Sequence, residues 1–183
     1  MNLPNVLTLS RIFFAAILVI LLEANTIMGN IGAIVIFTIA SLTDFYDGYL
    51  AKTYGLISNF GKIMDPIADK VLLLSVFGVF AHLHLIAWWM FAVIAIREIV
   101  VTVSRLMAMR QGMVLAAERA GKIKTVVQMM AVSFILIYLV AQQSIAWFGQ
   151  VQTAWWIFNQ GLMWAAVILT VYSGIEYFRG LNK

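Results

Sequence analysis

Residues 31–69 read IGAIVIFTIASLTDFYDGYLAKTYGLISNFGKIMDPIAD, an apolar run that leads into a segment holding four aspartates. The apolar part, residues 31–51, has about the 20 residues that a helix needs to cross the hydrocarbon core of a bilayer. Lipid offers the backbone no hydrogen-bond partners, so such a span is helical. A carboxylate in or beside a membrane helix costs several kcal/mol unless it is paired, hydrated or bound to a metal. The stretch therefore predicts a membrane helix whose acids have a functional reason to be there.

Five more stretches of similar character surround this one: residues 6–22, 65–85, 88–109, 124–148 and 155–178. The composition agrees with a chain solvated by lipid. Of the 183 residues, 63% are hydrophobic and 11% are charged, against about 45–50% and about 25% in soluble domains. The absence of cysteine excludes disulfides and thiolate metal sites. The sequence predicts an all-α, polytopic membrane protein with six transmembrane helices in a single domain, residues 1–183.

Basic residues are distributed unevenly among the connections between the predicted spans. Lys or Arg occurs in the second and fourth connections, at the carboxyl end and at Arg11 near the amino end, whereas the first, third and fifth connections carry none. Since Lys and Arg concentrate on the cytoplasmic side of membrane proteins, both termini are predicted to be cytoplasmic. The same distribution accounts for the net charge of +4 without nucleic acid as a partner. The absence of a transit-like extension favours a bacterial plasma membrane.

The four aspartates form two stripes at helical spacing. The first stripe is Asp44, Asp47, Gly48 and Ala51, and the second is Gly61, Asp65 and Asp69. At about 100° per residue, the members of each stripe share one helix face. Pro66 is expected in the first turn of its helix, where no backbone donor is lost. Because a short loop joins the two helices, their cytoplasmic ends are predicted to bring all four carboxylates together.

Four neighbouring carboxylates repel one another unless cations neutralise them. Ligands that are all oxygen suit a hard cation, so the cluster predicts bound Mg²⁺ or Mn²⁺. Gly48 and Gly61 would let a bulky ligand such as a nucleotide approach the backbone. Equally, small residues at these positions could serve only close helix packing.

The same residues resemble the signature of the CDP-alcohol phosphotransferase family, D-x2-D-G-x2-A-R-x8-G-x3-D-x3-D. Every gap matches, and Lys52 stands where the family has Arg. Lys keeps the positive charge but loses the planar fork that grips phosphate at two points. The resemblance implies that the nucleotide-binding residues are Asp44, Asp47, Gly48, Ala51, Lys52 and Gly61. It also implies metal ligation by Asp44, Asp47, Asp65 and Asp69, a catalytic base at Asp69, and a homodimer.

Shorter segments, residues 2–11, 96–98 and 121–125, resemble the phosphatidylglycerophosphate synthase branch of that family. This branch implies CDP-diacylglycerol and glycerol 3-phosphate as substrates, alongside membrane lipid. Four basic residues could then form a cytoplasmic pocket for the acceptor phosphate: Arg97, Arg105, Lys122 and Lys124. Alternatively, these cations set the membrane topology or pair with Glu98 and Glu118.

Other readings remain open. Family members with a different acceptor, such as inositol phosphate, serine or phosphatidylglycerol, share the aspartate motif. A transporter would place its charges near the midplane of repeated halves, a pattern that this sequence lacks. A membrane prenyltransferase also uses aspartates and Mg²⁺, but carries them on helices distant in sequence.

Overall fold

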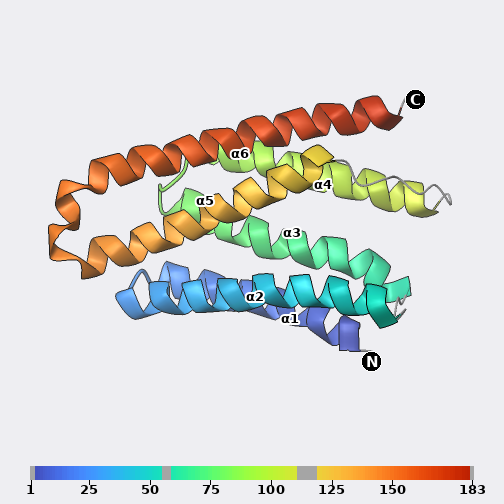
Figure 1. Ribbon diagram of the computed structural model, residues 1–183, viewed down its shortest axis with the longest axis horizontal. Coiled ribbons are helices and arrows are strands. Elements are labelled where there is room, and N and C mark those ends of the chain that lie inside the picture. The colour runs from blue at the N-terminus through green and yellow to red at the C-terminus, as the bar shows by residue number, and fades with distance from the viewer. Residues whose placement is uncertain (1–2, 55–58, 111–118, 182–183) are drawn as a thin grey trace. The chain divides into compact units, whose positions relative to one another are not determined.

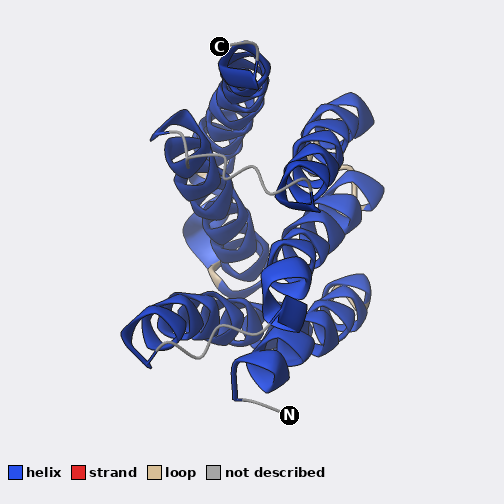
Figure 2. Ribbon diagram, turned by 90° about the vertical axis from the view of Figure 1, so that its right-hand side faces the viewer, coloured by secondary structure: helices blue, strands red, loops and turns tan. Residues whose placement is uncertain are grey.

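The protein is described by a computed structural model that covers residues 3–54, 59–110 and 119–181. Side chains are described within these ranges except at residues 3–9, 44–54, 59–63, 65, 110, 119 and 181. The elements are α1 (Leu3–Glu23), α2 (Ile27–Tyr54), α3 (Asn59–His82), α4 (Trp88–Arg110), α5 (Arg119–Ser144), a short 3-10 helix η1 (Ala146–Gln150) and α6 (Gln152–Leu181). The described residues contain no strand (Figure 2), so the predicted all-α class is confirmed.

Two helices end through a residue in the left-handed backbone region. After α3, His84 has φ 57°, its N–H donates to the Ala81 carbonyl at 3.2 Å, and the Leu85 N–H donates to Phe80 at 2.9 Å. This pair of bonds satisfies helix carbonyls in the manner of a Schellman cap. The third span was predicted to reach residue 85, but α3 ends at His82 because this cap turns the chain. Asn25, φ 45°, follows α1 in a similar way.

The fifth span was predicted to run to residue 148, which is wrong. At Ile145 the backbone becomes extended, with φ −110° and ψ 109°, and η1 follows. The physical reason is an aromatic cluster. Phe148 is buried, with its ring 5.8 Å from that of Tyr138 and 5.9 Å from that of Trp155. Burying this ring needs a turn between α5 and α6 rather than a longer α5.

Pro66 lies further inside α3 than the sequence suggested. It was expected in the first turn, but α3 begins at Asn59 and includes Pro66 as an interior residue. Proline has no N–H to donate, so α3 lacks one of its own backbone hydrogen bonds at this point. Neighbouring residues at membrane depth can accommodate such a proline.

The chain divides into two compact units, Met1–Val79 and Phe80–Lys183. In the first unit, α1 packs on α2 through buried residues such as Leu18, Leu22 and Ala33. Thr26 caps α2, because its Oγ1 accepts a hydrogen bond from the Gly29 N–H at 3.1 Å. Gly29 must be glycine, since a Cβ there would lie 2.5 Å from the Leu21 carbonyl oxygen.

In the second unit, α6 packs against both α5 and α4 (Figure 1). Buried polar contacts join these helices, such as the 3.0 Å hydrogen bond from Gln128 Nε2 on α5 to Thr170 Oγ1 on α6. Two stretches of the described residues, Ala120–Ser144 and Gln152–Gly180, are long and apolar enough to cross a membrane by length and composition. This unit therefore combines apolar helices with a few buried polar contacts between them.

Candidate active site

The seven matched positions of the aspartate motif, together with Lys52, lie on two consecutive helices of the first unit. The second half of α2 holds Asp44, Asp47, Gly48, Ala51 and Lys52, and the first half of α3 holds Gly61, Asp65 and Asp69. Only residues 55–58 separate the two helices in sequence, so their facing ends lie within about 18 Å of each other. The helices therefore carry the motif as predicted. The side chains fall outside the described residues except that of Asp69, and their convergence stays a prediction.

The Asp69 side chain is partly exposed, and its carboxylate is paired with the ammonium group of Lys70. Its carboxylate Oδ2 accepts a hydrogen bond from Lys70 Nζ at 2.6 Å, and its side chain is 36% exposed. An ion pair at such a site contributes about 0–1 kcal/mol to stability. A substrate or a metal ion could therefore displace Lys70 from the carboxylate at little cost. The sequence did not single out Lys70.

In the second unit, two of the predicted phosphate ligands meet on one carboxylate. Lys124 Nζ, from α5, donates a hydrogen bond to Oε1 of Glu98, on α4. The Arg97 guanidinium lies 3.6 Å from the same oxygen. Glu98 and Lys124 are both buried, at 1% and 2% exposure, and the Arg97 side chain is 14% exposed. The contact between Lys124 and Glu98 is one that the sequence had left open as an alternative to phosphate binding.

Arg97 and Arg105 share a face of α4, as their spacing of eight residues predicted. Both are directed at α6. The Cγ of Arg97 lies 3.3 Å from the point where Gly174 would carry a Cβ, and the Arg105 guanidinium is 6.0 Å from the ring centroid of Tyr177. A cation over an aromatic face is attracted by the ring quadrupole. The two arginines are thus held by different residues on the same face of α6.

Lys122 does not join this group. It is exposed, whereas Lys124, two residues later on α5, is buried. Two residues along a helix correspond to about 200°, so the two side chains leave α5 in nearly opposite directions. Of the four predicted phosphate ligands, the structure brings Arg97 and Lys124 together and places Lys122 apart from them.

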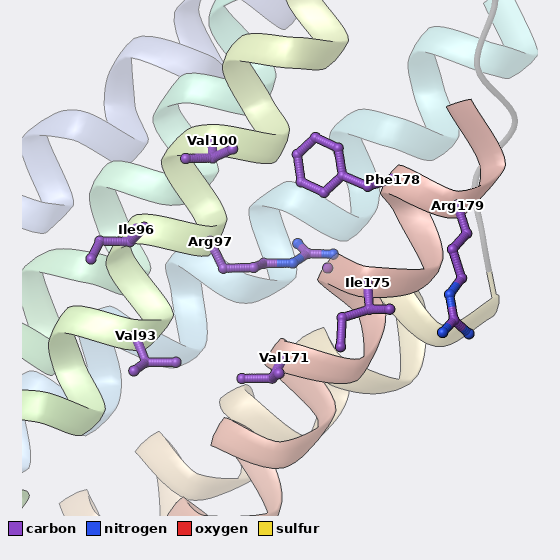
Figure 3. Close-up of a pocket in the computed structure, with 9 residues that line it drawn as sticks. Val93, Ile96, Arg97, Val100, Val171, Ile175, Phe178 and Arg179 are labelled. Carbon is purple, nitrogen blue, oxygen red and sulfur yellow. The ribbon is translucent and has the colours of Figure 1, made fainter. Parts of the chain in front are cut away.

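A groove of about 590 Å³ lies between α4 and α6. Figure 3 shows Arg97 reaching from α4 across the groove towards α6, among side chains such as Val93, Val171 and Phe178. Arg179, in the last turn of α6, also lines it. The groove is therefore apolar along its length and cationic at Arg97 and Arg179.

The family model for CDP-alcohol phosphatidyltransferase matches residues 1–172 of the chain. The chain belongs to this family. As a CDP-alcohol phosphatidyltransferase it is an enzyme, and its apolar helices agree with a membrane protein.

Relatives match this phosphatidyltransferase over nearly its whole length. A Bacillus subtilis protein named CDP-diacylglycerol–glycerol-3-phosphate 3-phosphatidyltransferase is 36% identical, with 97% of this chain and 93% of the relative covered. A Mycobacterium tuberculosis protein named probable phosphatidylglycerophosphate synthase is 35% identical, with 96% and 79% covered. An Escherichia coli protein with the same name as the Bacillus one is 30% identical, with 96% and 92% covered.

Three residues of this phosphatidyltransferase stand out in the structure but not in the sequence: Glu98, Lys70 and Arg179. Glu98 was weighed only as an ion-pair partner for the four predicted phosphate ligands, although an acid next to Arg97 in a predicted membrane span was itself a usable signal. Arg179 follows Val171 and Ile175 at intervals of four residues, which could have placed it on the groove. Among the side chains that the structure describes, no three His, Cys, Asp or Glu residues gather as metal ligands.

Proposed function

We propose that this enzyme transfers the phosphatidyl group of CDP-diacylglycerol to glycerol 3-phosphate, giving phosphatidylglycerophosphate and CMP. One observation carries the choice of acceptor: relatives covered almost end to end bear names that state this reaction. The aspartate motif supports the chemistry but not the acceptor, because other family branches share it. The segments at residues 2–11, 96–98 and 121–125 support the same branch.

The proposal includes six membrane-crossing helices with both termini and the active site at the cytoplasmic face. Each α-helix has between 21 and 30 residues, and at about 1.5 Å per residue even the shortest is as long as the hydrocarbon core is thick. The basic residues fall on one set of connections, as the positive-inside rule requires. The bacterial relatives favour the plasma membrane, and a homodimer follows from the family resemblance.

The proposed metal site consists of Asp44, Asp47, Asp65 and Asp69, which hold Mg²⁺ or Mn²⁺. Carboxylate oxygens are the ligands that these hard cations prefer, and the exposed carboxylate of Asp69 fits this use. When bound, such a cation withdraws charge from the pyrophosphate of CDP-diacylglycerol. Gly48, Ala51 and Gly61 leave room for the nucleotide beside the acids, and Lys52 offers its phosphates a positive charge.

In the proposed reaction, Asp69 accepts the proton from the acceptor hydroxyl. The hydroxyl oxygen then forms a bond to the phosphorus that carries diacylglycerol, and the bond from that phosphorus to the CMP oxygen breaks. Lys70, bound to Asp69 at 2.6 Å, holds the carboxylate in place before substrate arrives. The acceptor's own phosphate is bound by Arg97, Arg105 and Lys124, while the exposed Lys122 attracts it over a longer distance.

The test is to supply purified protein with CDP-diacylglycerol, Mg²⁺ or Mn²⁺, and separate acceptors, and to identify the lipid product by mass spectrometry. Glycerol 3-phosphate should give phosphatidylglycerophosphate and an equal amount of CMP. Serine, inositol phosphate and phosphatidylglycerol should give no product. A product from one of these acceptors, and none from glycerol 3-phosphate, would replace the proposed acceptor. No product from any acceptor, with solute flux in vesicles, would favour a transporter.

A further inference from the structure

The groove between α4 and α6 is bordered by apolar side chains that the protein leaves exposed. Ile96 lies on its α4 side, and Val171, Ile175 and Phe178 lie on its α6 side (Figure 3). All four of these side chains are exposed. In a membrane, exposed side chains of this kind contact lipid tails, which are equally apolar. A molecule that occupies the groove therefore reaches it from the surrounding lipid.

The groove runs along the two helices for most of the depth of one leaflet. On α6 it extends from Val171 to Arg179, which is about 12 Å at 1.5 Å per residue. On α4 it extends from Val93 to Val100, which is about 10 Å. The hydrocarbon core is about 30 Å thick, so one leaflet contributes about 15 Å. Because Arg179 is in the last turn of α6, the groove has the position and length to hold an acyl chain that starts at this end of the helix.

The charged side chains that line the groove are two arginines, Arg97 and Arg179. Arg97 lies 3.6 Å from a carboxylate oxygen of Glu98, so part of its charge is met inside the protein. Arg179 is exposed, and none of the ion pairs between described side chains includes it. Glu176, three residues earlier on α6, does not line the groove. The end of the groove at Arg179 is therefore suited to an anion.

We propose that this groove binds an anionic glycerophospholipid of the surrounding leaflet, with the lipid phosphate at Arg179 and one acyl chain along the groove. Basic pockets between membrane helices are a recurring way in which anionic headgroups are bound. A cation at the helix end, followed by apolar walls, matches the order of phosphate and acyl chain in such a lipid. Arg97 keeps Glu98 as its partner and is not needed as a ligand. The proposal rests on the membrane-crossing arrangement proposed above and is independent of the acceptor.

The first test places the lipid on the protein. Phosphatidylglycerol and phosphatidylcholine, each with a photoactivatable diazirine in one acyl chain, are added separately to the purified protein in nanodiscs with EDTA, and crosslinked residues are mapped by mass spectrometry. The phosphatidylglycerol probe should label residues 93–100 and 171–179 about 5-fold more than the phosphatidylcholine probe, the preference expected from one cation at a lipid phosphate. Elsewhere on the chain the two probes should label equally. Equal labelling of the groove by both probes would overturn the proposal.

The second test removes the cation. Arg179→Gln should lower the preference of the groove for the phosphatidylglycerol probe from about 5-fold to within about 2-fold of the phosphatidylcholine probe. The matched control is Lys122→Gln, which removes one positive charge from an exposed position on α5 that does not line the groove. This variant should keep the preference. If both variants lose it equally, the protein attracts anionic lipid only through its net charge, and the site at Arg179 is refuted.

The third test fills the groove. Val171→Trp places a large indole on the α6 wall, so labelling of the groove by the phosphatidylglycerol probe should fall to the level of the phosphatidylcholine probe. Ile168→Trp is the matched control, because Ile168 is exposed on the same helix but does not line the groove. It should leave the labelling unchanged. Equal labelling of the two variants would mean that the acyl chain does not lie in the groove.

Two other occupants are distinguished by further measurements. The chain has no cysteine, so Ile175→Cys provides a single thiol for a benzophenone label. Illumination should attach this label to lipid, whereas attachment to a second copy of the chain would make the groove a protein interface and overturn the proposal. One equivalent of CDP-diacylglycerol, added with EDTA, should leave labelling by the phosphatidylglycerol probe in place. Its displacement would mean that the groove holds the lipid substrate, which would also overturn the proposal.

Discussion

The two charged regions of this enzyme are built in opposite ways. The acidic motif in the first unit occupies two consecutive helices, α2 and α3, with four residues between them. The basic cluster in the second unit draws on α4, α5 and α6, and its contacts between helices join residues far apart in sequence, 26 positions for Glu98 and Lys124 and 72 for Arg105 and Tyr177. The acids repeat at fixed spacing, whereas the cations are held by individual partners. Local spacing therefore groups the acids, whereas tertiary contacts are needed to decide which of the predicted cations belong together.

The two regions also differ in the chemical role proposed for each. The acidic region is proposed to act on the reacting atoms, so a change there should reduce kcat. The basic region is proposed to bind a distant phosphate, so a change there should raise KM for the acceptor. Variants ordered by the size of their expected effect can test this division.

The largest effect is expected for Asp69→Asn. The amide cannot take the proton from the acceptor hydroxyl, so kcat should fall by about 10²–10⁴-fold. Binding of CDP-diacylglycerol, measured by protection of the protein against thermal unfolding, should persist. Lys70→Gln is the matched comparison, because it removes only the partly buried partner of Asp69 and should lower kcat far less. Near-normal turnover by Asp69→Asn would remove Asp69 from the role of base.

The next effect is expected for Arg97→Gln, in the basic region. Loss of a mostly buried guanidinium that is proposed to bind the acceptor phosphate should raise the KM for glycerol 3-phosphate about 10–100-fold. Arg97→Lys should recover part of this, since Lys keeps the charge without the planar fork. Initial rates at varied glycerol 3-phosphate and saturating CDP-diacylglycerol measure the effect. A fall in kcat with no change in KM would contradict the division between the two regions.

These two regions show how much of the structure could be predicted from the sequence. Six apolar stretches predicted six helices, and the structure has them, because the length and periodicity of a membrane helix are local properties. The predicted ends of the helices were less accurate. The cap at His84 uses no glycine, and the turn at Ile145 depends on Phe148 packing against residues of two other elements. Neither feature could be predicted from the residues next to it in the sequence.

The candidate site likewise has one part that local spacing predicts and one part that depends on tertiary contacts. Spacing alone singled out the aspartates as candidate site residues, and they lie on the predicted helices. The grouping of Lys122 with Lys124 depended on their closeness in sequence, but burial separates them. The feature that distinguishes Lys124 is its contact with Glu98, which lies 26 residues earlier in the sequence. A contact of that range has no local signal.

A smaller effect is expected at Gly174, which lies on α6 close to Arg97. A Cβ at Gly174 would lie 3.3 Å from the Arg97 Cγ, so Arg97 must shift slightly in Gly174→Ala. The KM for glycerol 3-phosphate should rise about 2–5-fold, since small displacements of a binding group weaken its contacts. Gly161→Ala, on the same helix, is the matched control, because a Cβ there would meet no described atom within 4 Å. Equal effects of the two variants would mean that helix propensity, not Arg97, is responsible.

The smallest effect is expected for Lys122→Gln. Lys122 is exposed, and a solvated cation attracts an anion weakly and in a way that salt screens. The KM for glycerol 3-phosphate should rise about 2-fold at low ionic strength, and the difference should vanish near 0.5 M salt, where the screening length is only about 4 Å. Lys124→Gln measured alongside should retain its larger effect at high salt, because burial protects the contact between Lys124 and Glu98 from screening. If both variants show equal effects that salt removes, the basic region works as a diffuse positive surface. The basic region would then differ from the acidic motif in the sign of its charge alone.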